Sequence, residues 1–172
     1  FRPVWDEALG VDTGKPARRR ATRLEEASIR RADALYAPSR LLAEAVGSAT
    51  GREVSVIEPP FFIEEEVSDE ALPEELEGRP FLLFVGSFTR RKGVHVLAEI
   101  IELLLRDNPD LVFAFAGRDK DYENGRTMWE YLQVRAAETA DRLLYLGELP
   151  HSRLYPLLSR ASAVVLPSLA DN

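Results

Sequence analysis

The sequence predicts an α/β protein whose second half, residues 81–170, forms a doubly wound parallel sheet. From residue 81 onward, short apolar segments alternate repeatedly with segments of helical periodicity. The apolar segments, such as FLLFV and LVFAFAG, contain almost no polar residue. This is typical of strands that are buried on both faces by helices. The composition, 45% hydrophobic and 30% charged over 172 residues, is that of a globular chain.

The first half is expected to hold two helices and two short strands. A helix is predicted over 17–32, a strand over 33–37, a helix over 38–48 and a strand over 53–57. Ser39 suits the N-cap of the second helix, because its hydroxyl can accept a backbone N–H that the first turn leaves unpaired.

An acidic segment then separates the two halves. Residues 58–79 contain nine acidic residues and three prolines. Such a segment repels itself and packs poorly, so it reads as a connector. We therefore predict that residues 1–57 are the end of a first domain and that residues 58–80 connect it to a second. Residues 81–172 are then the first part of that second domain.

The second half is expected to alternate regularly. Strands are predicted over 81–85, 111–117, 142–147 and 163–168, with helices over 93–107, 126–138 and 152–162. Val94, Leu97 and Ile101 recur on one face of the first of these helices, which should pack on the sheet. Pro156 lies inside the last helix and is expected either to delay its start or to kink it.

Composition excludes several classes of function. The chain has no cysteine and only two histidines, His95 and His151, so neither a disulfide framework nor a metal site is expected. The net charge of −7 argues against nucleic acid as a partner. No apolar run reaches the roughly 18 residues of a membrane span. The first residue is Phe1, and the chain stops just after an apolar strand, so we expect a fragment of a longer protein.

A basic turn follows the first strand of the second half. Gly86 lets the chain leave the strand tightly, Gly93 opens the next helix, and Arg90, Arg91 and Lys92 lie between them. Ligands of open α/β sheets bind beyond the carboxyl ends of the strands, where helix N-termini favour anions. The turn is therefore either a phosphate site or a solvated basic turn. The glycine patterns of dinucleotide-binding folds and of P-loops are both absent, which disfavours those two classes.

Four segments carry a family resemblance. FVGSFTRRKG, FAFAGRD, LYLGELP and AVVLPSLADN resemble, in order and spacing, the second domain of the retaining nucleotide-sugar glycosyltransferases of bacterial group 1. The upstream ASIRRADALYAPSRLLAEAV and VSVIEPPF resemble the end of their first domain. The resemblance implies the GT-B fold of two Rossmann-like domains. It also implies transfer of a sugar, with retention, from a UDP- or GDP-type donor, without a cofactor or an obligatory metal.

The same resemblance implies which residues hold the donor diphosphate. In this family the turn after the first strand does so, which corresponds here to Gly86, Ser87, Lys92 and Gly93. The family often has an arginine where this chain has Ser87. Either Arg90 or Arg91 is expected to supply that charge.

Further positions follow from the other segments. Leu149 and Pro150 are implied to contact the base. Asp171 stands at the first of two acidic positions and is expected, with Lys92, to be catalytic; its other interpretation is a helix cap. Asp119 is either a ligand contact or an ordinary turn residue.

The partners expected are the nucleotide-sugar donor and an unidentified sugar, lipid or small-molecule acceptor. The arginines between Arg18 and Arg31 form either a solvated helix face or a contact for phospholipid or a phosphorylated acceptor. The expected location is the cytoplasm, with peripheral contact at the inner membrane face. The alternatives are a non-catalytic module that binds a nucleotide or phosphosugar, and a phosphorylase or epimerase of the same fold. The fragment itself is expected to be inactive.

Overall fold

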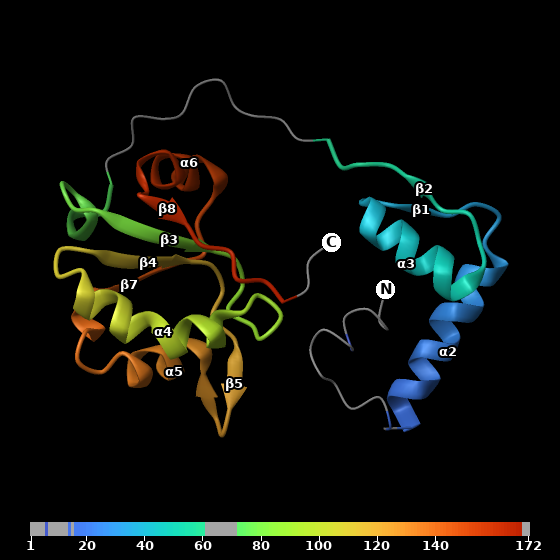
Figure 1. Cartoon of the computed structure of the whole chain (residues 1–172), viewed down its shortest axis with the longest axis horizontal. Helices are drawn as coiled ribbons and strands as arrows, with labels where there is room; N and C mark the ends of the chain where they lie inside the picture. Colours follow the sequence, from blue (N-terminus) through green and yellow to red (C-terminus); the bar gives the residue numbers. More distant parts are fainter. Residues whose placement is uncertain (1–5, 7–13, 15, 61–71, 170–172) are drawn as a thin grey trace. The chain divides into compact units, whose positions relative to one another are not determined.

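The computed structural model describes residues 6, 14, 16–60 and 72–169. The described residues divide into two compact units, one up to residue 60 and one over residues 72–169. Figure 1 shows the elements of both units, coloured in sequence order. Asp171 and residues 61–71 of the predicted connector lie outside the described residues.

The first unit contains α2 (Pro16–Arg31), β1 (Tyr36–Ala37), α3 (Arg40–Thr50) and β2 (Ser55–Val56). The two strands pair in parallel and are shorter than the sequence predicted. The prediction for Ser39 is confirmed, since its hydroxyl accepts the Leu42 N–H at 3.3 Å at the start of α3. Gly51 ends the same helix in the left-handed conformation, with φ of 68°.

Two arginines fix the ends of α2. Near its start, Arg18 pairs with the buried carboxylate of Asp6, and this hydrogen bond raises the pKa of the guanidinium. At its end, Arg52 donates to the carbonyls of Arg30 and Ala32, both at 2.8 Å. Arg18 is therefore a structural residue, whereas Arg19, Arg20, Arg23, Arg30 and Arg31 are exposed.

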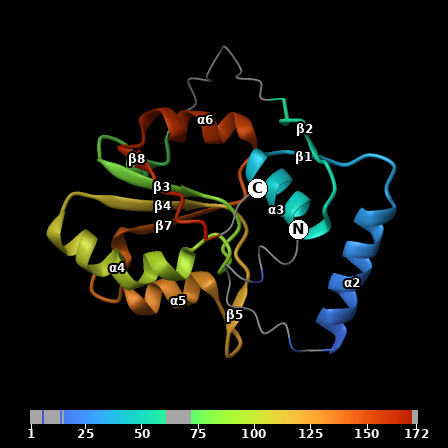
Figure 2. The same ribbon diagram turned by 45° about the vertical axis from the view of Figure 1, so that its right-hand side comes forward.

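The second unit is a four-stranded sheet with helices on both faces. Its strands are β3 (Phe81–Val85), β4 (Val112–Ala116), β7 (Leu143–Gly147) and β8 (Ala163–Val164). They are all parallel, in the order β7-β4-β3-β8. Figures 1 and 2 show α6 (His151–Arg160) over one face, and α4 (Val94–Asp107) and α5 (Met128–Arg135) over the other. The predicted doubly wound parallel sheet is confirmed.

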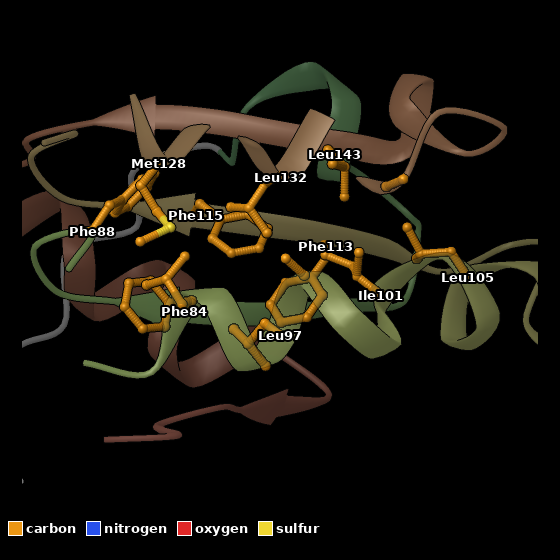
Figure 3. Close-up of a cluster of buried hydrophobic side chains, with 13 residues drawn as sticks. Phe84, Phe88, Leu97, Ile101, Leu105, Phe113, Phe115, Met128, Leu132 and Leu143 are labelled. Atoms are coloured by element: carbon orange, nitrogen blue, oxygen red, sulfur yellow. The ribbon is translucent and has the colours of Figure 1, made fainter. Parts of the chain in front are cut away.

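Alternate strand residues fill the two cores. Phe84, Phe113 and Phe115 pack against α4 and α5, and Figure 3 shows them with Leu97 and Ile101 of α4. The opposite face buries Phe81, Leu83 and Ala114 against Leu157 of α6. Because both faces are covered, these strands carry no alternation of polar and apolar residues.

Part of the predicted connector packs into the second core. The short 3-10 helix η1 (Glu74–Leu76) places Leu76 in the cluster with Phe81 and Leu157, where it is 1% exposed. The described residues 72–80 therefore pack with the sheet of the second unit.

An unpredicted hairpin precedes α5. β5 (Asp121–Glu123) and β6 (Arg126–Thr127) pair antiparallel around Asn124 and Gly125, whose φ angles are 55° and 76°. Asn-Gly favours a hairpin turn with both central residues at positive φ, so the signal was present in the sequence. Thr127 and Glu130 then form a capping box that starts α5.

The last helix departs from its prediction. α6 begins at His151, well before Pro156, so the expected delay does not occur. Pro156 removes one backbone donor from the helix interior. Pro156 is buried in the helix next to Leu157, and this burial of apolar surface offsets part of that loss.

Candidate functional site

The exits of three parallel strands are joined by backbone hydrogen bonds. Gly86 donates its N–H to the Ala116 carbonyl at 2.9 Å, and Gly117 donates to the Gly147 carbonyl at 2.7 Å. Phe88 donates to the Arg118 carbonyl, also at 2.9 Å. The loops that follow β3, β4 and β7 are thus held side by side at the edge where ligands of such sheets bind.

Two glycines at this edge have no room for a side chain. Gly117 has φ of 142°, and a Cβ built on it would lie 2.0 Å from the Gly86 carbonyl oxygen. Gly93 has φ of 71°, and a Cβ there would lie 1.9 Å from the Pro167 carbonyl oxygen. Leu169 also donates its N–H to the Arg91 carbonyl at 2.9 Å. The basic turn is therefore packed against the segment that follows β8.

A pocket of about 410 Å³ opens beyond the carboxyl ends of β3, β4 and β7. It combines an apolar floor with backbone groups of the glycine-containing loops and three charged side chains. Its lining is Val85, Gly86, Ser87, Ala116, Gly117, Arg118, Lys120, Glu148, Leu149 and Leu154. Pockets of this size, with few polar groups on an apolar base, are typical of small-molecule sites.

Two of the charged residues form an ion pair across the pocket. The Nε and Nη2 atoms of Arg118 donate to the two carboxylate oxygens of Glu148 at 2.6 and 2.9 Å. This hydrogen bonding raises the pKa of Arg118 and lowers that of Glu148. The sequence analysis missed both residues. The sequence signal that could have identified them is their position. Each directly follows a glycine at the end of an apolar strand segment.

Three of the predicted donor residues line this pocket, namely Gly86, Ser87 and Leu149. Lys92 is not in the lining, but its Cδ would lie 4.0 Å from a Cβ built on Gly86, so its side chain runs beside that glycine. Pro150 forms the N-cap of α6, and its carbonyl accepts the Arg153 N–H at 3.0 Å.

The Arg90 side chain of the basic turn contacts the hairpin that precedes α5. Arg90 donates from Nη1 to the Tyr122 hydroxyl at 3.0 Å, and its guanidinium lies 5.6 Å from the centre of that ring. Neither Arg90 nor Arg91 is among the described residues that line the pocket. Arg90 thus faces the hairpin.

Asp119 is engaged in its own turn. Its Oδ1 accepts the N–H groups of Lys120 at 2.9 Å and Trp129 at 3.1 Å. These contacts fit the interpretation of Asp119 as an ordinary turn residue.

Tyr145 connects the loop after β4 to the aromatic ring of Trp129 in α5. Its hydroxyl donates to the Gly117 carbonyl at 3.2 Å and accepts the Asp119 N–H at 3.3 Å. Its ring stacks on Trp129 with 5.2 Å between centroids. Tyr145 therefore positions the loop that carries Gly117 and Arg118, a role that the sequence analysis did not assign.

Among the described residues, no cluster of three or more histidine, aspartate or glutamate side chains is arranged to hold a metal ion. Within the same ranges, no helix is both long and apolar enough to cross a membrane.

Comparison with known proteins gives one family and several relatives. The family model of glycosyl transferases group 1 matches residues 67–172. Glycogen synthase of Mycobacterium tuberculosis is 34% identical over 87 residues, which is 51% of this chain and 20% of that enzyme. The chain thus spans a fifth of the length of this curated relative.

Solved structures resemble the chain over a larger share of its length. Sucrose-phosphate synthase from Thermosynechococcus elongatus matches with a TM-score of 0.65 and 21% identity, over 97% of this chain and 43% of that one. Anabaena HepE, in complex with UDP and glucose, matches with a TM-score of 0.60 and 18% identity, over 86% and 41%. At these identities the likeness establishes the fold, which is of the GT-B type.

Proposed function

The chain belongs to the group 1 glycosyl transferases, and we propose that its pocket beyond β3, β4 and β7 binds the nucleoside diphosphate of a sugar donor. The observation that carries the proposal is the pocket itself. It places the backbone of Gly86 and Ser87, two cationic side chains and an apolar floor in one cavity at the carboxyl edge of the sheet. The complex of HepE with UDP and glucose supports a ligand of this class.

The chemistry proposed is the departure of the diphosphate from the donor sugar. Negative charge develops on the diphosphate as the glycosidic bond breaks. Lys92 and the first turn of α4 supply positive charge that is already in place when this happens. Leu149 would then face the base and Asp171 the sugar or ribose, as the resemblance implies.

The remaining features of the whole protein are also proposals. Transfer proceeds with retention to a sugar, lipid or small-molecule acceptor and requires no cofactor. The protein acts in the cytoplasm, and the exposed arginines of α2 contact acidic lipid at the inner membrane face. Since the chain spans 20% of glycogen synthase, a complete acceptor site is not expected within it.

A thermal-shift panel tests the donor site. The chain is heated with UDP, GDP, ADP, their glucose conjugates, a sugar phosphate and, as controls, the corresponding nucleosides. A ligand present at 100 times its dissociation constant should stabilise the second unit by about 2.7 kcal/mol. Stabilisation by a sugar phosphate but by no nucleotide would instead favour a phosphosugar-binding module. No shift with any of these compounds would contradict the proposal.

A further inference from the structure

The geometry points to Arg118 as the guanidinium that binds the donor diphosphate, with Glu148 orienting it. This inference rests on the donor site proposed above. It assigns to the loop after β4 a role that the sequence analysis had given to Arg90 or Arg91.

Arg118 lies directly across from the glycine-containing loop. Its carbonyl accepts the Phe88 N–H at 2.9 Å, and its neighbour Gly117 packs on the Gly86 carbonyl. Ser87, which lies between those two contacts, lines the pocket but carries no charge. The cations of the pocket lining are Arg118 and Lys120, both from the loop after β4. Within the pocket lining, an anion beside Ser87 therefore has a guanidinium available at Arg118.

Arg90 and Arg91 make contacts outside the pocket lining. The Arg90 guanidinium contacts both the hydroxyl and the ring of Tyr122, on the hairpin that precedes α5. The Arg91 backbone is held by Leu169, and its side chain does not line the pocket. Recruiting Arg90 would require breaking its contacts with Tyr122, whereas Arg118 already lines the cavity.

The ion pair leaves Arg118 able to bind a phosphate. Glu148 takes hydrogen bonds from Nε and Nη2, but a guanidinium has five N–H donors, so Nη1 remains for a second acceptor. The two side chains are 59% and 58% exposed, so the pair is weakly held and can adjust. A phosphate fits the planar guanidinium fork as well as a carboxylate does. Glu148 thus orients the Arg118 guanidinium, while its own negative charge repels an anionic ligand.

The test is a titration of the 172-residue chain and its variants with UDP, GDP and ADP by calorimetry. The corresponding nucleosides are titrated by NMR, since they bind weakly. Arg118→Ala is expected to weaken binding of the preferred diphosphate about 10-fold or more, the loss expected for one charge-assisted hydrogen bond. Nucleoside affinity should stay within about twofold, and Arg118→Lys should recover part of the loss.

Two further variants sharpen the result. Glu148→Gln keeps an acceptor for Arg118 but removes the opposing charge, so diphosphate binding should tighten by about threefold. Arg106→Ala is the matched control, because Arg106 is exposed in the last turn of α4 and outside the pocket lining. Circular dichroism confirms that each variant is folded.

The outcomes separate this inference from the proposed function. If the unaltered chain binds no nucleoside diphosphate, the donor site itself is overturned, and the role of Arg118 with it. If it binds one and Arg118→Ala binds equally well, only the role of Arg118 is overturned. An equal loss of nucleoside and diphosphate affinity would assign the side chain to the base, which also overturns the inference. Arg90→Ala is titrated in the same way, and a loss of diphosphate affinity confined to that variant would also overturn the inference.

Discussion

Gly117 and Gly86 approach each other so closely that Gly117 has no room for a side chain. A Cβ on Gly117 would lie 2.0 Å from the Gly86 carbonyl oxygen, and the backbone φ of 142° is itself unfavourable for other residues. This contact joins the loop after β4 to the glycine that lines the pocket. The Gly86 carbonyl is therefore in direct contact with the loop that follows the neighbouring strand.

Gly117→Ala should consequently destabilise the second unit and weaken nucleotide binding. The strained backbone and the collision together are expected to cost about 2 kcal/mol or more in the free energy of unfolding. Gly78→Ala is the matched control, since Gly78 has φ of 68° but open space around a Cβ. Urea unfolding measures both variants. Equal losses in the two would show that the contact with Gly86 has no energetic effect.

Lys92→Ala should remove most of the affinity for nucleoside diphosphates and leave the fold intact. A hydrogen bond from a charged group is typically worth about 1.5–3 kcal/mol. Lys92 runs beside Gly86, but its side chain is outside the cores described above, so stability should change little. Calorimetry with the preferred nucleotide measures the effect. An unchanged affinity would return the basic turn to its interpretation as a solvated turn.

Tyr145→Phe should loosen the loop after β4. The change removes a hydrogen bond to the Gly117 carbonyl and one from the Asp119 N–H, while the ring can keep its stacking on Trp129. We expect a loss of about 1 kcal/mol in stability, together with weaker nucleotide binding. Tyr155→Phe, a tyrosine in α6 outside this network, serves as control. Weaker binding in both variants, or in neither, would show that the Tyr145 hydroxyl does not position the loop.

The Glu148 carboxyl should titrate below its ordinary pKa of 4.5, because Arg118 donates to its charged form. A carboxyl whose pKa is lowered by folding contributes stability above its unfolded pKa, and this is lost as the pH falls through the folded pKa. The contribution is therefore complete at neutral pH and disappears in the acid range below 4.5. Carbon-detected NMR titration measures the midpoint. The same midpoint in Arg118→Ala would contradict this cause.

The chain by itself should not turn over a donor, since it spans a fifth of the length of the curated glycogen synthase. Catalysis requires donor and acceptor to be held together, and loss of positioning alone can remove many orders of magnitude of rate. Incubating the chain with nucleotide sugars and following nucleoside diphosphate release tests this. Multiple turnovers by the chain would place the whole active site within these 172 residues.

The sequence by itself determined the layered α/β fold of the second unit. Strands such as 81–85 and the apolar face of 93–107 depend on local periodicity, which a single sequence displays directly. The same holds for Ser39, whose capping bond spans three residues. Gly86 was also identified locally, from its place at the end of a strand.

Only the tertiary structure decided which charges face the pocket. Arg118 and Glu148 lie thirty positions apart and meet because β4 and β7 are neighbours in the sheet. Arg90 likewise contacts Tyr122 on a hairpin that lies 32 positions further along the chain. Strand order and side-chain direction arise from packing between distant segments, and no local pattern encodes them.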